Sequence, residues 1–182
     1  MKSIKDRYKK LRQRGLTLIE AAMVLAIATL VVAGIMIFFQ SASINNKTNE
    51  AMAQLNSLQS SVRSVYAGQS TYVGLTEADL INAKTVPSKM VSGTGLRHAF
   101  NAAITIAPAS VGGTDNAFTV TYVGVPQEAC SKMGLFDLGT GVARFSIQGN
   151  DILTDADRTQ TVAEVTAACD SANNNTMVWT FF

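Results

Sequence analysis

The sequence predicts an α+β protein in which a long N-terminal helix packs against a head built on an antiparallel β-sheet. Three observations lead to this prediction. A long apolar run follows a short basic leader near the N-terminus. Apolar residues then recur at helical spacing up to about residue 67. From residue 68 to residue 182, which we call the head, short segments alternate between apolar and polar residues in the manner of strands.

The apolar run extends from Leu16 to Phe39, a stretch of 24 residues with one ionisable side chain, Glu20. A helix of that length reaches about 36 Å, which exceeds the ~30 Å hydrocarbon core of a bilayer. An ordinary secretory signal has a shorter apolar stretch of roughly 7–15 residues. Residues 16–40 are therefore predicted to form the transmembrane half of a long helix.

The leader, residues 1–15, contains seven Lys or Arg residues and one acidic residue. A basic flank of this density keeps its end of a membrane protein in the cytoplasm. The whole chain has a formal net charge of +2, so removal of the leader would change the charge of the side chains to −4. A chain with more acidic than basic residues is a poor binder of phosphate backbones, and no nucleic-acid partner is expected.

The helix is predicted to continue as an amphipathic half over residues 41–67 and to stop at Gly68, a residue type that commonly ends helices. Apolar residues fall three or four positions apart in most steps, which places them on one face. That face consists of Ile44, Met52, Leu55, Leu58, Val62, Val65 and Tyr66. The opposite, polar face carries Asn49, Glu50, Gln54, Gln59, Ser60 and Arg63. We expect the apolar face to pack on the head.

Two short helices are predicted in the head. The first begins after Thr76, which is its N-cap, with Asp79 three residues later. It ends before Pro87, because the residue that precedes a proline is biased away from helical geometry. The second covers residues 126–133 and has its proline in the first turn.

Four strands are predicted from alternating apolar residues and a high content of β-branched and aromatic residues. They cover residues 103–106, 117–123, 144–147 and 176–182. The first two flank a glycine-containing turn and are expected to form a hairpin. The last is strongly apolar and is expected to lie inside the sheet. The segments 92–95 and 148–175 are predicted to be loops.

The segment Gly15-Leu16-Thr17-Leu18-Ile19-Glu20, after a basic leader and before an apolar helix, resembles the processing site of type IV prepilins. The resemblance implies that a membrane peptidase cuts after Gly15 and methylates the new amine of Leu16. Leucine at that position, and Ala33-Gly34 in place of an early proline, resemble the type IVb subclass. That subclass includes toxin-coregulated, bundle-forming and plasmid thin-pilus pilins.

This resemblance implies the type IV pilin fold and the role of major structural subunit of a type IVb pilus. The subunit would polymerise through its N-terminal helix into a filament for adhesion, aggregation or conjugative mating-pair contact. Its implied partners are other copies of itself, the prepilin peptidase and the inner-membrane assembly machinery. It would lie in the bacterial inner membrane as a precursor, leader in the cytoplasm, and then in the extracellular filament.

Glu20 is the most informative single residue, because a carboxylate inside a spanning helix is costly and usually has a partner or a function. Among parallel, staggered helices, Glu20 of one subunit could lie beside the Leu16 amine of the next. A buried charge pair is tolerable and fixes register, whereas a lone buried charge is very unfavourable. This is also the role that the resemblance implies. The alternative is a carboxylate that reaches the membrane interface.

Small residues line the apolar helix and would let neighbouring helices approach closely. They are Ala21, Ala22, Ala26, Ala28, Ala33 and Gly34. The alternative is that alanine is simply a common helix residue.

The chain has two cysteines, Cys130 and Cys169. A head that faces the periplasm or the exterior is in an oxidising environment, where a disulfide is the expected state. A bridge between them would bound the C-terminal region of the head. The alternative is a pair of buried free thiols.

No catalytic, metal or cofactor site is expected, because no nucleophile elbow, phosphate loop or zinc pattern is present. The single histidine, His98, is expected to be structural. The polar residues Asn150, Asp151, Asp155 and Asp157 lack the spacing of a calcium loop and are expected to be solvated. Trp179 and the Phe181-Phe182 end are expected to belong to the core.

Two other functions remain open from the sequence. One is a pseudopilin or minor pilin of a secretion or pilus system, which shares the same N-terminal features. The other is a signal-anchored periplasmic binding domain or enzyme that does not polymerise. It predicts an uncut N-terminus and a monomeric head.

Overall fold

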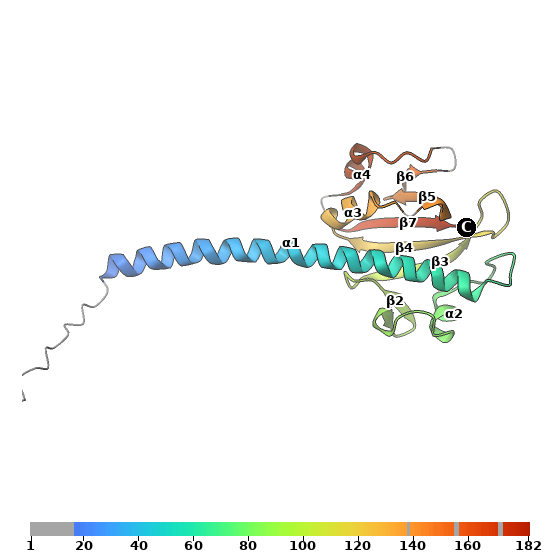
Figure 1. Ribbon diagram of the computed structural model, residues 1–182, viewed down its shortest axis with the longest axis horizontal. Coiled ribbons are helices and arrows are strands. Elements are labelled where there is room, and N and C mark those ends of the chain that lie inside the picture. Colours follow the sequence, from blue (N-terminus) through green and yellow to red (C-terminus); the bar gives the residue numbers. More distant parts are fainter. Residues whose placement is uncertain (1–16, 138, 155–156, 171–172) are drawn as a thin grey trace, which may run out of the picture. The chain divides into compact units, whose positions relative to one another are not determined.

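The computed structural model describes residues 17–137, 139–154, 157–170 and 173–182 (Figure 1). The chain divides into two units, residues 1–41 and Ala42–Phe182. Helix α1, Leu18–Val65, supplies nearly all of the described part of the first unit and the opening segment of the second. Each unit is considered by itself below.

In the second unit, α1 buries one face, as predicted. Met52, Leu55, Leu58 and Val62 are buried in the main hydrophobic cluster. The prediction is wrong for Gln54, which was assigned to the polar face but is only 6% exposed. Its side-chain oxygen accepts a hydrogen bond from the backbone N–H of Ala99 at 2.9 Å, so this buried oxygen has a partner. Helical spacing cannot predict such a bond, because Ala99 lies outside the helix.

Helix α1 ends at Val65, three residues before the predicted stop at Gly68. The chain then makes a tight turn in which the N–H of Gln69 donates to the carbonyl of Tyr66 at 2.9 Å. The Tyr66 ring is buried and lies 5.5 Å from the ring of Tyr72. Packing of this ring pair fixes the turn, so a glycine C-cap is not required.

The head contains one seven-stranded antiparallel sheet with the order β1-β2-β3-β4-β7-β5-β6 (Figure 1). The strands are β1 Val91–Ser92, β2 Gly95–Arg97, β3 Ala103–Ala109, β4 Ala117–Val125, β5 Val142–Ile147, β6 Asn150–Leu153 and β7 Asn175–Phe181. β3 and β4 form the predicted hairpin. β7 pairs with β4 on one side and β5 on the other, so the prediction that the last strand lies inside the sheet is confirmed.

Two segments that were predicted to be loops contain regular structure. In the segment 92–95, Ser92 ends β1 and Gly95 begins β2, and the turn between them has Gly93 at a φ of +64°. The segment 148–175 contains β6 and helix α4, Val162–Ala168. These elements are short and offer few apolar residues, so periodicity does not reveal them. α4 does carry a local signal, because Thr161 and Glu164 form a capping box at its start.

The two predicted short helices are present as α2, Glu77–Asn82, and α3, Gln127–Gly134. Thr76 is the N-cap of α2, and its backbone N–H donates to the Asp79 carboxylate at 2.8 Å, which confirms the predicted capping box. Short 3₁₀ turns cover Ser88–Met90 and Gly139–Gly141.

Aromatic rings fill the core between α1 and the sheet. Trp179 stacks on Phe145 at 5.2 Å and meets the edge of Tyr122 at 5.4 Å. The Tyr122 hydroxyl donates to the backbone carbonyl of Ala51 in α1 at 3.3 Å, and burial raises the pKa of this hydroxyl. Trp179 is therefore a core residue, as predicted.

The prediction that Phe181-Phe182 lies in the core is right for Phe181 and wrong for Phe182, which is 43% exposed. β7 ends at Phe181, so the next side chain falls outside the ladder. The main-chain oxygen of Phe182 instead accepts hydrogen bonds from Nε and Nη2 of Arg63 in α1, at 3.1 and 2.9 Å. This contact ties the end of the sheet to the helix.

His98 is a structural residue, as expected, and closes the turn between β2 and β3. Its Nε2 lies 2.8 Å from the carbonyl of Val123, and its Nδ1 accepts the N–H of Phe100 at 3.2 Å. The ring is buried and stacks on Tyr122 at 4.8 Å. Both contacts suit a neutral ring that carries its proton on Nε2. Burial lowers the pKa of His98 below its usual value of 6.5.

Gly134, at the end of α3, lies close to neighbouring side chains. A Cβ at this position would lie 2.6 Å from Cγ1 of Val165 and 3.2 Å from Cδ1 of Ile147. We predict that Gly134→Ala lowers the free energy of unfolding by about 1–3 kcal/mol, as overpacking usually does. Thermal unfolding of the chain in detergent, followed by circular dichroism, measures the change.

The matched control for this prediction is Gly68→Ala, because no heavy atom lies within 4 Å of a Cβ at Gly68. This variant should be as stable as the wild type or slightly more stable. Equal stability of the two variants would contradict the close approach of α3 to α4 and β5.

The lowered pKa of His98 predicts how stability depends on pH. Between the lowered pKa and about 6.5 the unfolded chain binds more protons at this residue than the folded chain, so stability falls as the pH drops below about 6.5. Denaturant unfolding at pH 7 and pH 5 should show a larger loss for the wild type than for His98→Gln. Carboxylates titrate lower and affect both proteins equally. Identical pH profiles would contradict the prediction.

Candidate functional site

The first feature of interest is the apolar part of α1 in the first unit. Its large side chains are exposed throughout, from Leu18 at 90% to Phe39 at 66%. By length and composition, α1 is also the one helix among the described residues that could cross a membrane. A continuous apolar surface of this size must be covered by lipid or by other protein.

The start of α1 is fixed by Thr17 and Glu20. The backbone N–H and the hydroxyl of Thr17 both donate to Oε2 of Glu20 at 2.8 Å, and the Glu20 N–H donates back to the Thr17 hydroxyl at 3.3 Å. This is a capping box, which satisfies backbone donors at the helix N-terminus. Sequence analysis missed the role of Thr17, although Thr-Leu-Ile-Glu matches the capping-box signature.

The two predicted processing residues, Gly15 and Leu16, lie outside the described residues. Glu20 is exposed at the first turn of α1. Its Oε1 makes no hydrogen bond within the described part of the chain, since both Thr17 donors use Oε2. One oxygen of the Glu20 carboxylate therefore has capacity for another partner.

The small residues of α1 leave room beside the helix. Leu25, Ala28, Thr29, Val32, Ala33 and Met36 line a shallow apolar hollow. No heavy atom lies within 4 Å of the position that a Cβ would occupy at Gly34. A second helix could approach the backbone here more closely than it could approach large side chains.

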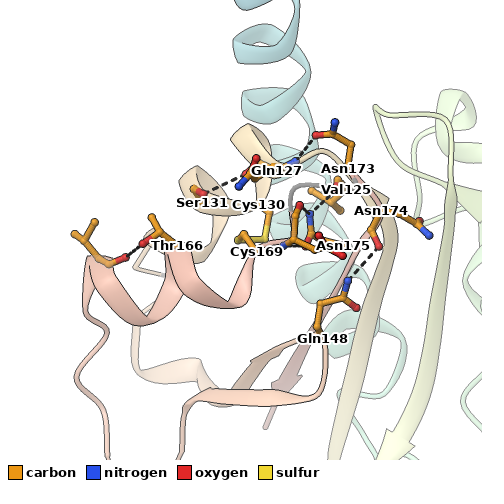
Figure 2. Close-up of a disulfide and its surroundings, with 12 residues drawn as sticks. Val125, Gln127, Cys130, Ser131, Gln148, Thr166, Cys169, Asn173, Asn174 and Asn175 are labelled. Atoms are coloured by element: carbon orange, nitrogen blue, oxygen red, sulfur yellow. Dashed lines mark hydrogen bonds between the residues drawn. A yellow bond between two sulfur atoms is a disulfide. The ribbon is translucent and has the colours of Figure 1, made fainter.

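In the head, the predicted disulfide between Cys130 and Cys169 is present, with a sulfur–sulfur distance of 2.06 Å (Figure 2). It joins α3 to the C-terminal end of α4 across a sequence separation of 39 residues. Closing a loop of this length stabilises a fold by about 4 kcal/mol in the chain-entropy model. Free buried thiols, the alternative reading, are not found.

Asn175 organises the segment that follows the disulfide, and sequence analysis did not identify it (Figure 2). Its side chain is fully buried. Nδ2 donates to the carbonyls of Val125 and Asp170, both at 3.1 Å, and Oδ1 accepts the Asp170 N–H at 2.5 Å. A run of asparagines in the sequence does not show which one has this role, because the role also requires Val125, which lies 50 positions away in sequence.

Asn173 adds a second bond in the same region, since its Oδ1 accepts the backbone N–H of Gln127 at the start of α3 (Figure 2). The disulfide, Asn173 and Asn175 thus hold the end of α4, the start of α3 and the ends of β4 and β7 together.

The four polar residues that were predicted to form a solvated loop do not lie in one loop. Asn150 and Asp151 are exposed on β6, and Asp155 lies outside the described residues. The Asp157 carboxylate accepts hydrogen bonds from the backbone and the hydroxyl of Thr159, which lower its pKa. Across the described ranges, no three His, Cys, Asp or Glu residues gather in a way that could hold a metal ion.

Two family models match the chain. The bundlin model matches residues 40–181, and the model of the prokaryotic N-terminal methylation motif matches residues 10–36. Together they cover the end of the basic leader from residue 10, most of the long helix and nearly all of the head.

Two relatives are described as the major structural subunit of the bundle-forming pilus, from Escherichia coli O127:H6 (strain E2348/69 / EPEC) and from Escherichia coli O111:H-. Each is 31% identical over 93% of this chain and 94% of its own length.

Solved structures share the fold. A type IVb pilin from Salmonella typhi aligns with a TM-score of 0.56 at 22% identity, over 71% of this chain and 95% of its own. A type IV pilin from Vibrio cholerae El Tor biotype aligns with a TM-score of 0.54 at 13% identity, over 75% of this chain and 99% of its own. The chain therefore belongs to the bundlin family and is a type IV pilin.

Proposed function

We propose that this chain is the major structural subunit of a type IVb pilus and polymerises through α1. The observation that carries the proposal is the exposed apolar segment of α1, in a chain whose head is closed by a disulfide. Similarity to pilus major subunits along almost the whole chain supports the same role. The subunit is an inner-membrane precursor first and part of an extracellular filament afterwards.

This role assigns a separate function to each segment of the chain. Residues 1–15 are a cytoplasmic leader that the prepilin peptidase removes between Gly15 and Leu16, with methylation of the new amine. Residues 16–40 anchor the subunit and later form the filament core. Residues 41–67 carry the helix onto the head, and residues 68–182 form the outer wall.

Energetics limit the environments open to the apolar segment. Each large apolar side chain moved out of water gains roughly 1.5–3 kcal/mol. Fourteen such side chains between Leu18 and Phe39 are exposed in the subunit. The segment must therefore pass directly from lipid into a bundle of α1 helices. Because lipid is as apolar as leucine, this step depends on close packing and polar pairing, which small residues and Glu20 can supply.

We infer that Glu20 pairs with the Leu16 amine of a neighbouring subunit in the filament. The capping box occupies one carboxylate oxygen, and Oε1 remains for this partner. A carboxylate that served only as a helix cap would need no charge, since a neutral amide oxygen accepts the same hydrogen bonds. The alternative role at the membrane interface predicts no effect on assembly.

Among the surface roles, aggregation and adhesion are the ones we propose, because the similar Escherichia coli proteins are named for a bundle-forming pilus. Conjugative contact remains a further hypothesis. The inner-membrane assembly machinery is proposed as the partner that moves the subunit from lipid to filament. No catalytic activity is part of this proposal. Pseudopilin, minor-pilin and non-polymerising roles are less well supported, since the named relatives are major pilus subunits.

Intact mass and N-terminal sequence of protein sheared from the cell surface test processing. We expect a chain that begins at Leu16 and carries one additional methyl group. A chain that begins at Met1, or near Ile44, would refute processing at Gly15 and with it the filament role.

Three substitutions test the assembly role of Glu20. Glu20→Ala and Glu20→Gln should both leave the subunit in the membrane and reduce filaments at least about tenfold, because each removes the charge from a buried pair. Thr17→Val is the matched control. It removes a cap worth about 1 kcal/mol and should leave filaments near the wild-type level. Electron microscopy and the yield of sheared filaments measure the outcome.

Normal filaments from Glu20→Gln, together with loss of filaments in Thr17→Val, would show that Glu20 acts only as a helix cap. That result would refute the pairing but not the structural role of the subunit.

A further inference from the structure

A polar cleft of about 380 Å³ lies between α1 and the segment 89–101 of the head. Its walls carry side chains from one turn of the helix, where Glu50 is half-buried and Gln54 is buried, and from the β1–β2 hairpin with the turn that follows. The polar lining residues are Glu50, Gln54, Lys89, Ser92, Arg97 and Asn101. All of them belong to the second unit of the chain.

Gln54 is the feature that points to a ligand. The residue is only 6% exposed, and its Oε1 is used by the N–H of Ala99 at 2.9 Å. This bond assigns the other amide atom as Nε2, which makes no hydrogen bond to any described residue. Every buried side-chain nitrogen or oxygen without solvent access has a partner within the described chain, so the Nε2 group must reach the open space of the cleft. Nε2 is therefore a donor without a partner among the described residues that faces the open space of the cleft, where an acceptor group of a ligand can replace water.

Arg97 is held in place on the same cleft. Its Nε donates to the Ser92 hydroxyl at 3.0 Å, and its Nη1 donates to the carbonyl of Asn101 at 2.9 Å. Its Nη2 makes no hydrogen bond within the described part of the chain. The guanidinium is therefore oriented before any ligand arrives, which lowers the entropy cost of binding.

Lys89 and Glu50 form an ion pair of 2.7 Å on the rim of the cleft. Their charges cancel, so the cleft retains one surplus positive charge on Arg97. The Glu50 carboxylate also disfavours an anion with two charges, such as phosphate. The unpaired groups are hydrogen-bond donors from Gln54 and Arg97, so a singly charged, acceptor-rich group is the best complement.

We propose that this cleft binds a carboxylate group, with its oxygens on Gln54 Nε2 and Arg97 Nη2. The carboxylate belongs to one of two sources. It is either part of a free small molecule or the side chain of an Asp or Glu residue from a second copy of this chain. The volume of the cleft admits several more atoms than the carboxylate alone.

The first test is a titration of the processed full chain in detergent micelles with sodium propionate, followed by NMR of the Ala99 backbone amide, which donates to the Gln54 side chain and is present in every variant. We expect saturable shifts and affinity at least about fivefold higher than for propionamide, which has the same shape without the charge. Arg97→Gln should weaken binding of propionate about fivefold or more.

Two further variants separate binding from folding. Gln54→Glu keeps an acceptor for the Ala99 N–H but replaces Nε2 by an oxygen that repels a carboxylate, so it should also abolish the preference for propionate. Lys47→Gln is the matched control, because it removes one positive charge from an exposed position of α1 outside the cleft. It should bind propionate as the wild type does.

The second test identifies the source. Sheared filaments assembled from a mixture of ¹⁴N and ¹⁵N subunits are treated with a carbodiimide, which joins Lys89 Nζ to an adjacent carboxylate as an amide with loss of water. A mixed-isotope peptide that links Lys89 to an acidic residue shows that a second copy supplies the carboxylate. Saturable propionate binding without such a peptide assigns a free ligand.

The proposal is overturned if propionate and propionamide bind equally or not at all and no mixed-isotope link from Lys89 forms. The titration requires no filament, so its failure is separable from failure of the proposed function. The internal link between Lys89 and Glu50, which lie 2.7 Å apart, confirms that the reagent has reacted at the cleft.

Discussion

The head depends on the packing of the amphipathic half of α1 against the aromatic face of the sheet. Leu55, Leu58 and Val62 share one hydrophobic cluster with the rings of β4, β5 and β7. The Tyr122 hydroxyl bonds the backbone of α1 within this cluster, and Arg63 binds the end of β7 from the same helix. A single helix therefore positions both the centre of the sheet and its last strand.

The C-terminal region needs a different kind of stabilisation, because it offers little apolar surface of its own. α4 buries mainly Val165. The disulfide between Cys130 and Cys169, and the hydrogen bonds of Asn175, hold this region against α3 and β4. Covalent and polar links supplement the limited hydrophobic packing in this region.

The apolar part of α1 has the opposite character, since none of its large side chains is buried within the subunit. The Thr17–Glu20 capping box begins the helix at the edge of this surface and leaves one carboxylate oxygen available. In such a subunit the head buries its own hydrophobic core, whereas the apolar surface of the first unit needs a covering from outside the chain. Lipid covers that surface first, and the helices of other subunits are proposed to cover it afterwards.

The sequence by itself determined the long helix, the capping box at Thr76, the β3–β4 hairpin and the central place of the last strand, since each follows from local spacing or from composition. The processing motif was identified by its resemblance to type IV prepilins. The pairing of the two cysteines was predicted from the oxidising environment expected for a head outside the cytoplasm. Only the tertiary structure decided the burial of Gln54, the neutral contacts of His98, the network of Asn175, the exposure of Phe182 and the presence of β1, β2, β6 and α4. The bonds of Gln54 to Ala99, His98 to Val123 and Asn175 to Val125 join residues that are distant in sequence, and such contacts leave no periodic signal. The elements β1, β2, β6 and α4 are too short to show a clear period. Cleavage between Gly15 and Leu16 and the pairing of Glu20 remain predictions, because they concern the peptidase and neighbouring subunits rather than the fold of one chain.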